Sequence, residues 1–187
     1  WGKASVRPAA HVPQGAGDQP MDDLSIVIED PRWSAIEFEP LCETAIRAAL
    51  DHLGIDPDAC EVTVMACDDA RIAALNADFR GKPTATNVLS WPAEERGADV
   101  PGGHPQPVTP GVDGVCELGD IAISYDTCAA QARSAGKPMQ PHVSHLIVHG
   151  VLHLFGYDHE TDADAAVMEG LEVKILGKLG LDDPYRN

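Results

Sequence analysis

The stretch from His142 to His159, HVSHLIVHGVLHLFGYDH, constrains the fold more than any other part of the 187-residue chain. His149 and His153 are four residues apart, so on a helix they project from the same face. Gly156 can adopt the left-handed backbone that ends helices, and His159 follows shortly after it. Two imidazoles from one helical turn and a third from the chain beyond it can therefore converge on one point.

Three neutral imidazoles at one point are a ligand set of zinc, and they leave a fourth coordination position open, as in catalytic zinc sites. A chance pair is the alternative for His149 and His153 alone, and the third histidine favours the metal site. We therefore predict one tightly bound divalent metal ion per chain, with zinc as first choice, held by His149, His153 and His159.

At about 100° per residue, His142 and His145 fall on the same stripe of this helix as His149 and His153. His142 and His145 are therefore candidates either to contact the metal-binding histidines or to face a substrate. Polar residues at the wet end of a helix are an equal alternative. The opposite arc of the helix is apolar and carries Ile147, Val148, Val151, Leu152, Leu154 and Phe155.

The stretch departs from the zinc-protease signature H-E-x-x-H, because Gly150 stands where those enzymes carry the glutamate base. It is similar instead to the HGxLHLxGYDH signature of the YbeY family, bacterial endoribonucleases that act in ribosomal RNA maturation. Every fixed position from His149 to His159 is met. Two further blocks resemble this family, namely LNADFRGKPTATNVLSWP at Leu75–Pro92, with Trp91 in place of the usual Phe, and LGDIAIS at Leu118–Ser124.

The resemblance covers about residues 24–180 and implies a zinc-dependent endoribonuclease specific for single-stranded RNA. It implies roles in ribosomal RNA processing, at the 3' end of 16S rRNA, and in ribosome quality control. It also places Arg80 on the arginine that the family uses near its active site, so Arg80, His149, His153 and His159 form the expected catalytic set. The implied partners are single-stranded RNA, small-subunit rRNA, the ribosome or a ribosomal protein, and the Era GTPase, in the cytoplasm and without a membrane or DNA partner.

Periodicity predicts an α+β fold in a single domain. The resemblance adds a four-stranded mixed sheet packed with helices, with the metal site on a C-terminal helix. We expect a flexible leader or cloning remnant at 1–21, the domain at 22–182 with a flexible insert at 93–115, and a tail at 183–187. The predicted strands are 24–29, 61–66, 88–91 and 118–124, and the predicted helices are 38–53, 71–79, 125–134, 141–155 and 161–179.

The formal net charge of −17 argues against broad electrostatic binding of nucleic acid. An RNA substrate then requires a local basic patch or a protein partner, and Arg80, Lys82, Arg133 and Lys137 are the candidates for such a patch. The five cysteines are scattered and form no disulfide framework or CxxC pair, which is typical of a cytosolic protein with reduced thiols.

Several points of mechanism stay open in the sequence. The general base is one of Asp158, Tyr157 and metal-bound hydroxide, and either water or the RNA 2'-hydroxyl attacks. Asp120, within an apolar strand, needs a polar partner, which is a metal-binding histidine or a neighbouring loop. The alternative functions are a zinc peptidase or amidohydrolase, and a non-catalytic ribosome-assembly factor whose structural zinc has a fourth protein ligand.

Overall fold

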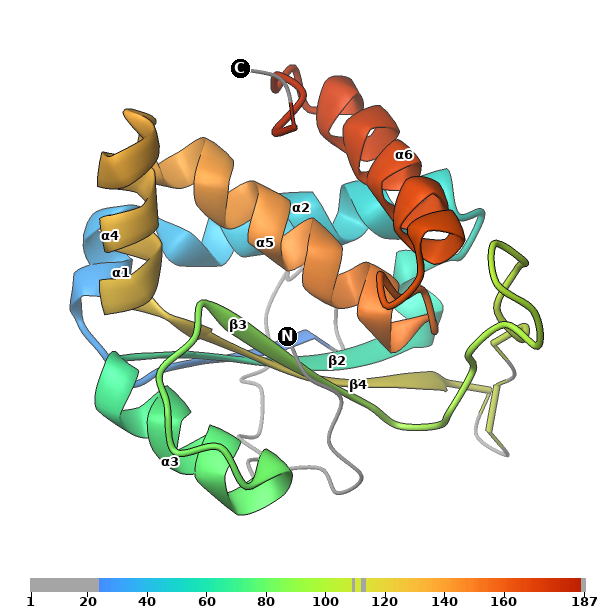
Figure 1. Cartoon of the computed structure of the whole chain (residues 1–187), viewed down its shortest axis with the longest axis horizontal. Coiled ribbons are helices and arrows are strands. Elements are labelled where there is room, and N and C mark those ends of the chain that lie inside the picture. The colour runs from blue at the N-terminus through green and yellow to red at the C-terminus, as the bar shows by residue number, and fades with distance from the viewer. Residues whose placement is uncertain (1–23, 109, 112–113, 186–187) are drawn as a thin grey trace.

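Four strands form one mixed sheet in the order β1-β2-β4-β3 (Figure 1). Strand β2 pairs in parallel with both β1 and β4, whereas β3 pairs antiparallel with β4 and occupies an edge. The predicted four-stranded mixed sheet is therefore confirmed. The strands are β1 (Leu24–Ile28), β2 (Cys60–Cys67), β3 (Val88–Pro92) and β4 (Cys116–Ser124).

The computed structural model describes residues 24–108, 110–111 and 114–185. The leader predicted at 1–21 and the last two residues of the tail lie outside the described residues. Two short helices, α1 and the 3-10 helix η1, had no counterpart in the sequence analysis. The helices are α1 (Arg32–Ala35), α2 (Phe38–His52), η1 (Pro57–Ala59), α3 (Asp69–Arg80), α4 (Tyr125–Ala135), α5 (Met139–Leu154) and α6 (Asp162–Lys178).

Local signals explain where the helices begin and end. The carboxylate of Asp68 accepts the backbone N–H of Arg71 at 2.9 Å and caps α3, which ends at Gly81 with φ 69°. The hydroxyl of Thr161 accepts the backbone N–H of Asp164 at 3.1 Å and caps α6.

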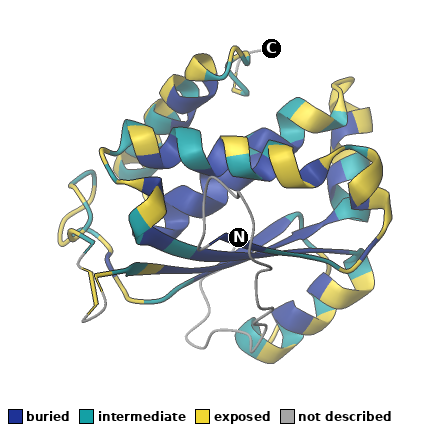
Figure 2. Cartoon of the chain, turned by 180° about the vertical axis from the view of Figure 1, so that it is seen from behind, coloured by how far each residue is buried: buried dark blue, intermediate teal, exposed yellow. Residues whose placement is uncertain are grey.

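The sheet is buried on both faces, and alternate strand residues face two different cores. Helices α2 and α5 lie over one face, where Val64 and Ile121 join the main core (Figure 1). Helix α3 lies on the other face and packs against a smaller cluster that includes Trp91 and Ala122. Figure 2 shows buried residues along the sheet and on the helix sides turned towards it.

Helix α5 lies very close to the sheet at Gly150. A Cβ atom at this position would lie 3.2 Å from Ile121 Cδ1 of β4, so a larger side chain would push the helix outward. The Ser90 hydroxyl of β3 donates to the carbonyl of Gly150 at 3.5 Å. Position 150 therefore faces the sheet, while the neighbouring histidines lie on another side of the helix.

Part of the segment expected as a flexible insert packs against the domain. Arg96 is 3% exposed and donates to the carbonyls of Leu154 at 2.9 Å and Glu117 at 3.1 Å. The backbone N–H of Gly102 donates to the Asp164 carboxylate at 2.7 Å. These residues are therefore anchored, and the flexibility of the insert as a whole stays a prediction.

All five cysteines are free. Among the described residues, no helix is long and apolar enough to cross a membrane.

Candidate metal centre

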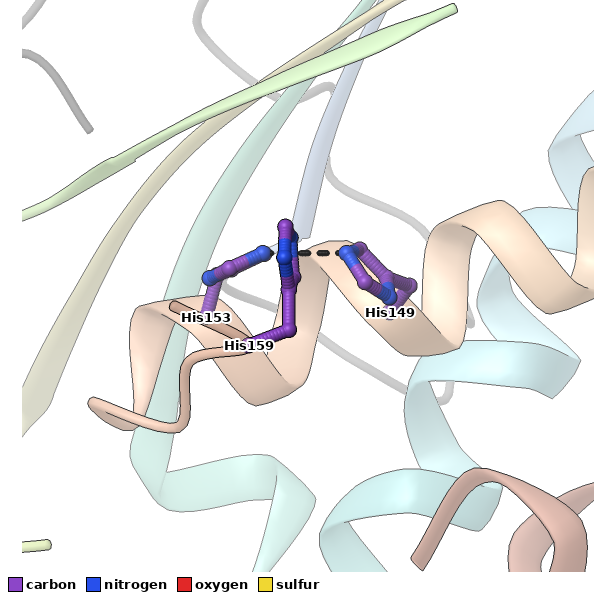
Figure 3. A group of neighbouring side chains, drawn as sticks. All are labelled: His149, His153 and His159. Carbon is purple, nitrogen blue, oxygen red and sulfur yellow. Dashed lines mark hydrogen bonds between the residues drawn. The ribbon is translucent and has the colours of Figure 1, made fainter. Parts of the chain in front are cut away.

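Three histidines converge at the C-terminal end of α5 (Figure 3). His149 and His153 extend from successive turns of α5, and His159 comes from the loop that follows this helix. The Nε2 atoms of His149 and His153 are 2.9 Å apart, and one ligand nitrogen from each of the three rings lies within 4.8 Å of the others. His149 and His153 are each 4% exposed, so the cluster is largely shielded from solvent.

A tight turn brings His159 back to the helix. Gly156 has φ 104°, and a Cβ there would lie 2.5 Å from the carbonyl oxygen of Arg96, so this turn requires glycine. The Asp158 carboxylate accepts the backbone N–H of His159 at 2.7 Å. Gly156 and Asp158 therefore set the direction from which the His159 ring approaches.

A fourth residue, Glu172 of α6, completes the surroundings of the cluster and was missed by sequence reasoning. Nδ1 of His149 lies 2.5 Å from a carboxylate oxygen of Glu172, which is fully buried. A signal was present, because Glu172 has the helical spacing of the buried Met168, Ile175 and Leu176. A carboxylate on such a buried stripe is rare unless it is paired.

Electrostatics keeps the imidazole of His149 neutral and the Glu172 carboxyl ionised. Burial lowers the pKa of His149 and outweighs the hydrogen bond that its ring donates to Glu172, which raises that pKa. Burial raises the pKa of Glu172, but the hydrogen bonds of His145 and His149 outweigh it and bring that pKa to about 2. A neutral imidazole has the free lone pair that a metal ligand needs.

This donor set fits a zinc-sized ion. Three imidazole nitrogens lie close enough to bind one ion, and none of them belongs to an exposed residue. Within the described part of the chain, no fourth His, Cys, Asp or Glu joins His149, His153 and His159 in this group. The three histidines could therefore offer three protein ligands to one ion.

A family model described as "Endoribonuclease YbeY" matches residues 26–180. The chain belongs to the YbeY family. The protein named Endoribonuclease YbeY from Ruegeria pomeroyi is 57% identical over 162 residues, which cover 87% of this chain and 97% of the relative. The one from Dinoroseobacter shibae is 58% identical over 162 residues, covering 87% of this chain and 90% of the relative.

A solved structure shows the same fold. The solution structure of the protein TM1509 from Thermotoga maritima superimposes with a TM-score of 0.50 at 21% identity, covering 88% of this chain and 99% of that one. At this identity the likeness bears on the architecture alone. The three histidines that the YbeY signature carries are the three that converge at the end of α5.

Arg80, the fourth residue expected from the YbeY resemblance, lies away from the histidine helix. It is the last residue of α3, which covers the face of the sheet opposite α5 (Figure 1). Its guanidinium donates to the Asn76 side chain at 3.5 Å. The edge strand β3 borders both faces of the sheet.

Asp120 also lies on the face of the sheet away from the histidines. Its neighbour Ile121 contacts Gly150 of α5, so by strand alternation Asp120 points to the opposite side. Asp120 pairs in register with Trp91, whose ring contacts Phe79 of α3. Of the two roles considered for Asp120, this placement favours a hydrogen bond to a neighbouring loop.

His142 and His145 have different surroundings. His142 Nε2 lies 3.0 Å from the Gln131 amide oxygen, and burial, followed by His145 and Lys137, lowers the pKa of His142 to about 4. His145 Nε2 lies 3.3 Å from Glu172 and belongs with the cluster of His149. Both histidines line a cavity of about 460 Å³ between α4, α5 and the C-terminal segment. His145 thus lies behind a candidate ligand, whereas His142 faces this cavity.

The four basic residues suggested as a rim do not form one patch. Arg80 and Lys82 lie at the C-terminal end of α3, and Arg133 and Lys137 lie at that of α4. Figure 1 shows these two helix ends on opposite sides of the sheet. A single basic surface for RNA is therefore not made from these residues.

Proposed function

We propose that this chain is a metal-dependent endoribonuclease that cleaves single-stranded RNA, with zinc as its metal. The convergence of His149, His153 and His159 in a member of the YbeY family is the observation that carries this proposal. The relatives named as endoribonucleases support RNA as the substrate, and the three-nitrogen donor set supports the metal.

We assign different roles in this activity to different residues. His149, His153 and His159 would hold the ion, which when bound lowers the pKa of water and polarises an oxygen of the scissile phosphate. Glu172 accepts a hydrogen bond from His149 and holds its ring. Arg80 would bind a phosphate of the RNA from across the edge strand and stabilise negative charge there.

Tyr157 and Asp158 were the protein side chains considered as general base. Burial raises the pKa of Tyr157 above its ordinary value of 10.0, so the phenol stays protonated at neutral pH and cannot accept a proton. Asp158 stands immediately before His159 and remains the carboxylate considered for this role. Of these two side chains, we therefore favour Asp158 as the base, and the candidate on the metal stays open.

The structure disfavours the two alternative functions. A peptidase of the H-E-x-x-H type needs its base at position 150, which here is a glycine that faces Ile121 of the sheet. A structural zinc needs a fourth protein ligand, and the described residues supply three. Both observations favour a metal centre that is open to a substrate.

We further propose that the natural substrate is small-subunit ribosomal RNA near the 3' end of 16S rRNA, with a role in ribosome quality control in the cytoplasm. The YbeY resemblance supports this context, with the ribosome and the Era GTPase as partners. The charge of −17 adds a physical reason for a partner, because a strongly acidic protein repels free RNA. A ribosomal partner would hold the RNA against this repulsion.

The test compares cleavage of single-stranded RNA and of casein, each with and without a chelator. We expect the protein to cleave RNA and not casein. The chelator should abolish RNA cleavage, and added zinc should restore it. His153→Ala should lose both the zinc, measured by elemental analysis, and the cleavage. His104→Ala, which removes an exposed histidine of the insert, is the matched control and should retain both.

Two results would contradict the proposal. Near-stoichiometric metal in a variant lacking all three of His149, His153 and His159 would remove the metal assignment. RNA cleavage that persists undiminished in the metal-free parent would separate the activity from the metal.

A further inference from the structure

The buried carboxylate of Glu172 joins three parts of the chain. One oxygen lies 2.5 Å from Nδ1 of His149 and 3.3 Å from Nε2 of His145, both on α5. The other oxygen accepts the hydroxyl of Tyr185 from the C-terminal segment. Glu172 itself is on α6 and has no solvent exposure.

We propose that Glu172, held by Tyr185 and His145, is the positioning residue that fixes the tautomer and orientation of His149 and so aims its Nε2 at the metal. This inference rests on the metal site of the proposed function. A neutral imidazole carries one N–H and one lone pair on its two nitrogens. One oxygen of Glu172 lies 2.5 Å from Nδ1 of His149 and the other already accepts the hydroxyl of Tyr185, so Nδ1 is the ring nitrogen that donates to the carboxylate.

The hydrogen on Nδ1 determines what the other ring nitrogen of His149 can do. With the hydrogen on Nδ1, the lone pair of His149 is on Nε2, which is the atom nearest to His153 in the cluster. Such support behind a metal-binding histidine raises its basicity and fixes its direction. Glu172 therefore acts on the metal through His149 and does not touch it.

The C-terminal segment keeps the carboxylate in place. The Tyr185 ring contacts the His145 ring edge-on at 5.5 Å between centroids, and the Tyr185 hydroxyl donates to Glu172. Burial, followed by the hydrogen bond to Glu172, raises the pKa of Tyr185, so the hydroxyl remains a donor. The end of the chain is thus a part of the metal centre, although it is remote from the histidines in sequence.

A second metal ion in this cluster is the competing interpretation. His145, His149 and Glu172 also offer three ligand atoms within 4.8 Å of one another. Two ions would have to share His149 through both of its ring nitrogens, and a neutral ring has one lone pair for this purpose. The hydrogen bonds satisfy the same atoms without removing a proton from the ring.

The experiment measures two quantities in the full chain. Nitrogen-15 NMR of the metal-free protein reports which ring nitrogen of His149 carries the hydrogen, and zinc affinity is obtained by competition with a chelator. In the parent we expect the hydrogen on Nδ1 and one zinc per chain. Glu172→Ala should lose the tautomer preference and bind zinc about 10- to 100-fold more weakly.

Further variants separate positioning from general stability. Glu172→Gln preserves the shape but offers an amide donor, so it should mix the two tautomers and weaken zinc binding. Tyr185→Phe removes the hydroxyl alone and should weaken zinc binding by less than Glu172→Ala does. Glu169→Gln is the matched control, because it removes a carboxylate one turn away on α6, and both readings should equal those of the parent.

The outcomes distinguish this inference from the function on which it rests. A parent that binds no zinc overturns the metal site, and the positioning role with it. A parent that binds one zinc, with unchanged affinity in folded Glu172→Gln and Tyr185→Phe variants, overturns the positioning role alone. Hydrogen on Nε2 of His149 in the metal-free parent, or two zinc ions per chain, also overturns it. Neither the NMR measurement nor the zinc affinity depends on RNA cleavage.

Discussion

Gly119 of β4 occupies a position where a side chain has no room. Its φ is 139°, and a Cβ would lie 2.1 Å from the carbonyl oxygen of Trp91 and 3.0 Å from the backbone nitrogen of Ala93. Both neighbours are backbone atoms and cannot rotate away. The antiparallel pairing of β3 with β4 therefore depends on glycine at this point.

We predict that Gly119→Ala lowers the free energy of unfolding by about 3 kcal/mol or more, through overpacking and backbone strain. Gly170→Ala is the control, because Gly170 lies in α6 with nothing within 4 Å of an added Cβ. It should raise that free energy by about 0.5–1 kcal/mol, since glycine is a poor helix former. Denaturant unfolding measures both, and a Gly119→Ala protein as stable as the parent would contradict the prediction.

Arg80 is the conspicuous cation at the end of α3. If it binds a phosphate in the transition state, Arg80→Ala should slow single-turnover RNA cleavage by about 30- to 1000-fold, which is about 2–4 kcal/mol. Arg80→Lys should recover part of this rate, because lysine cannot make a bidentate contact. Metal content and thermal midpoint should stay at the parent values.

Arg71→Ala is the matched control for Arg80, because it removes an exposed arginine near the start of the same helix. It should leave the cleavage rate unchanged. Equal cleavage rates for Arg80→Ala and the parent would show that Arg80 does not take part in the reaction. A slow Arg80→Ala protein that has also lost its metal would indicate a structural role instead.

Among the larger elements, the segment between β3 and β4 supports the turn that carries His159. Arg96 satisfies the carbonyl of Leu154 in the last turn of α5, where helix carbonyls have no partner within the helix. Its own carbonyl oxygen lies against Gly156. The end of α5 and the turn after it are thus held by a residue about sixty positions earlier in the chain.

We predict that Arg96→Ala lowers the free energy of unfolding by about 3 kcal/mol, because two buried carbonyls lose charge-assisted hydrogen bonds. Arg133→Ala, at an exposed position of α4, should change it by less than about 0.5 kcal/mol. Thermal or denaturant unfolding of the metal-free proteins is the measurement. An Arg96→Ala protein with the same free energy of unfolding as the parent would show that the segment does not support the domain.

Across the whole molecule, one ion-pair cluster ties the end of β1 to α1 and α4. Arg32 contacts the carboxylate of Asp30 at 2.6 Å and that of Asp126 at 2.8 Å. The hydrogen bond from Arg32 lowers the pKa of Asp30 below its ordinary value of 3.8, and that of Asp126 likewise. Arg32 is 48% exposed, so solvent screens these pairs and the stabilisation is modest.

The sign of the pH dependence follows from these lowered pKa values. A carboxyl group with a lowered pKa in the folded state stabilises the protein above its unfolded pKa, and this contribution is lost as the pH falls through the folded pKa. Arg32→Gln should therefore have a lower thermal midpoint than the parent at pH 6, and the difference should shrink below pH of about 4. A difference that persists unchanged at pH of about 2.5 would contradict this origin.

Much of the architecture was predictable because its signals are local. Apolar periodicity and a glycine stop such as Gly156 depend on residues within a turn or two of one another. Those signals located the four strands and the longer helices. The spacing of His149, His153 and His159 likewise predicted that they converge, since helix geometry and one turn determine their directions.

Contacts between distant segments were decided by the tertiary structure alone. The pairing of Glu172 with His149 depends on how α6 lies across α5, and Tyr185 reaches Glu172 from the end of the chain. Arg80 and Asp120 are the opposite case. Each lies in a sequence block that resembles the YbeY family, yet both belong to the face of the sheet away from the histidines. Local pattern determines which face of an element a side chain occupies. Only the packing of elements against one another determines what that face meets.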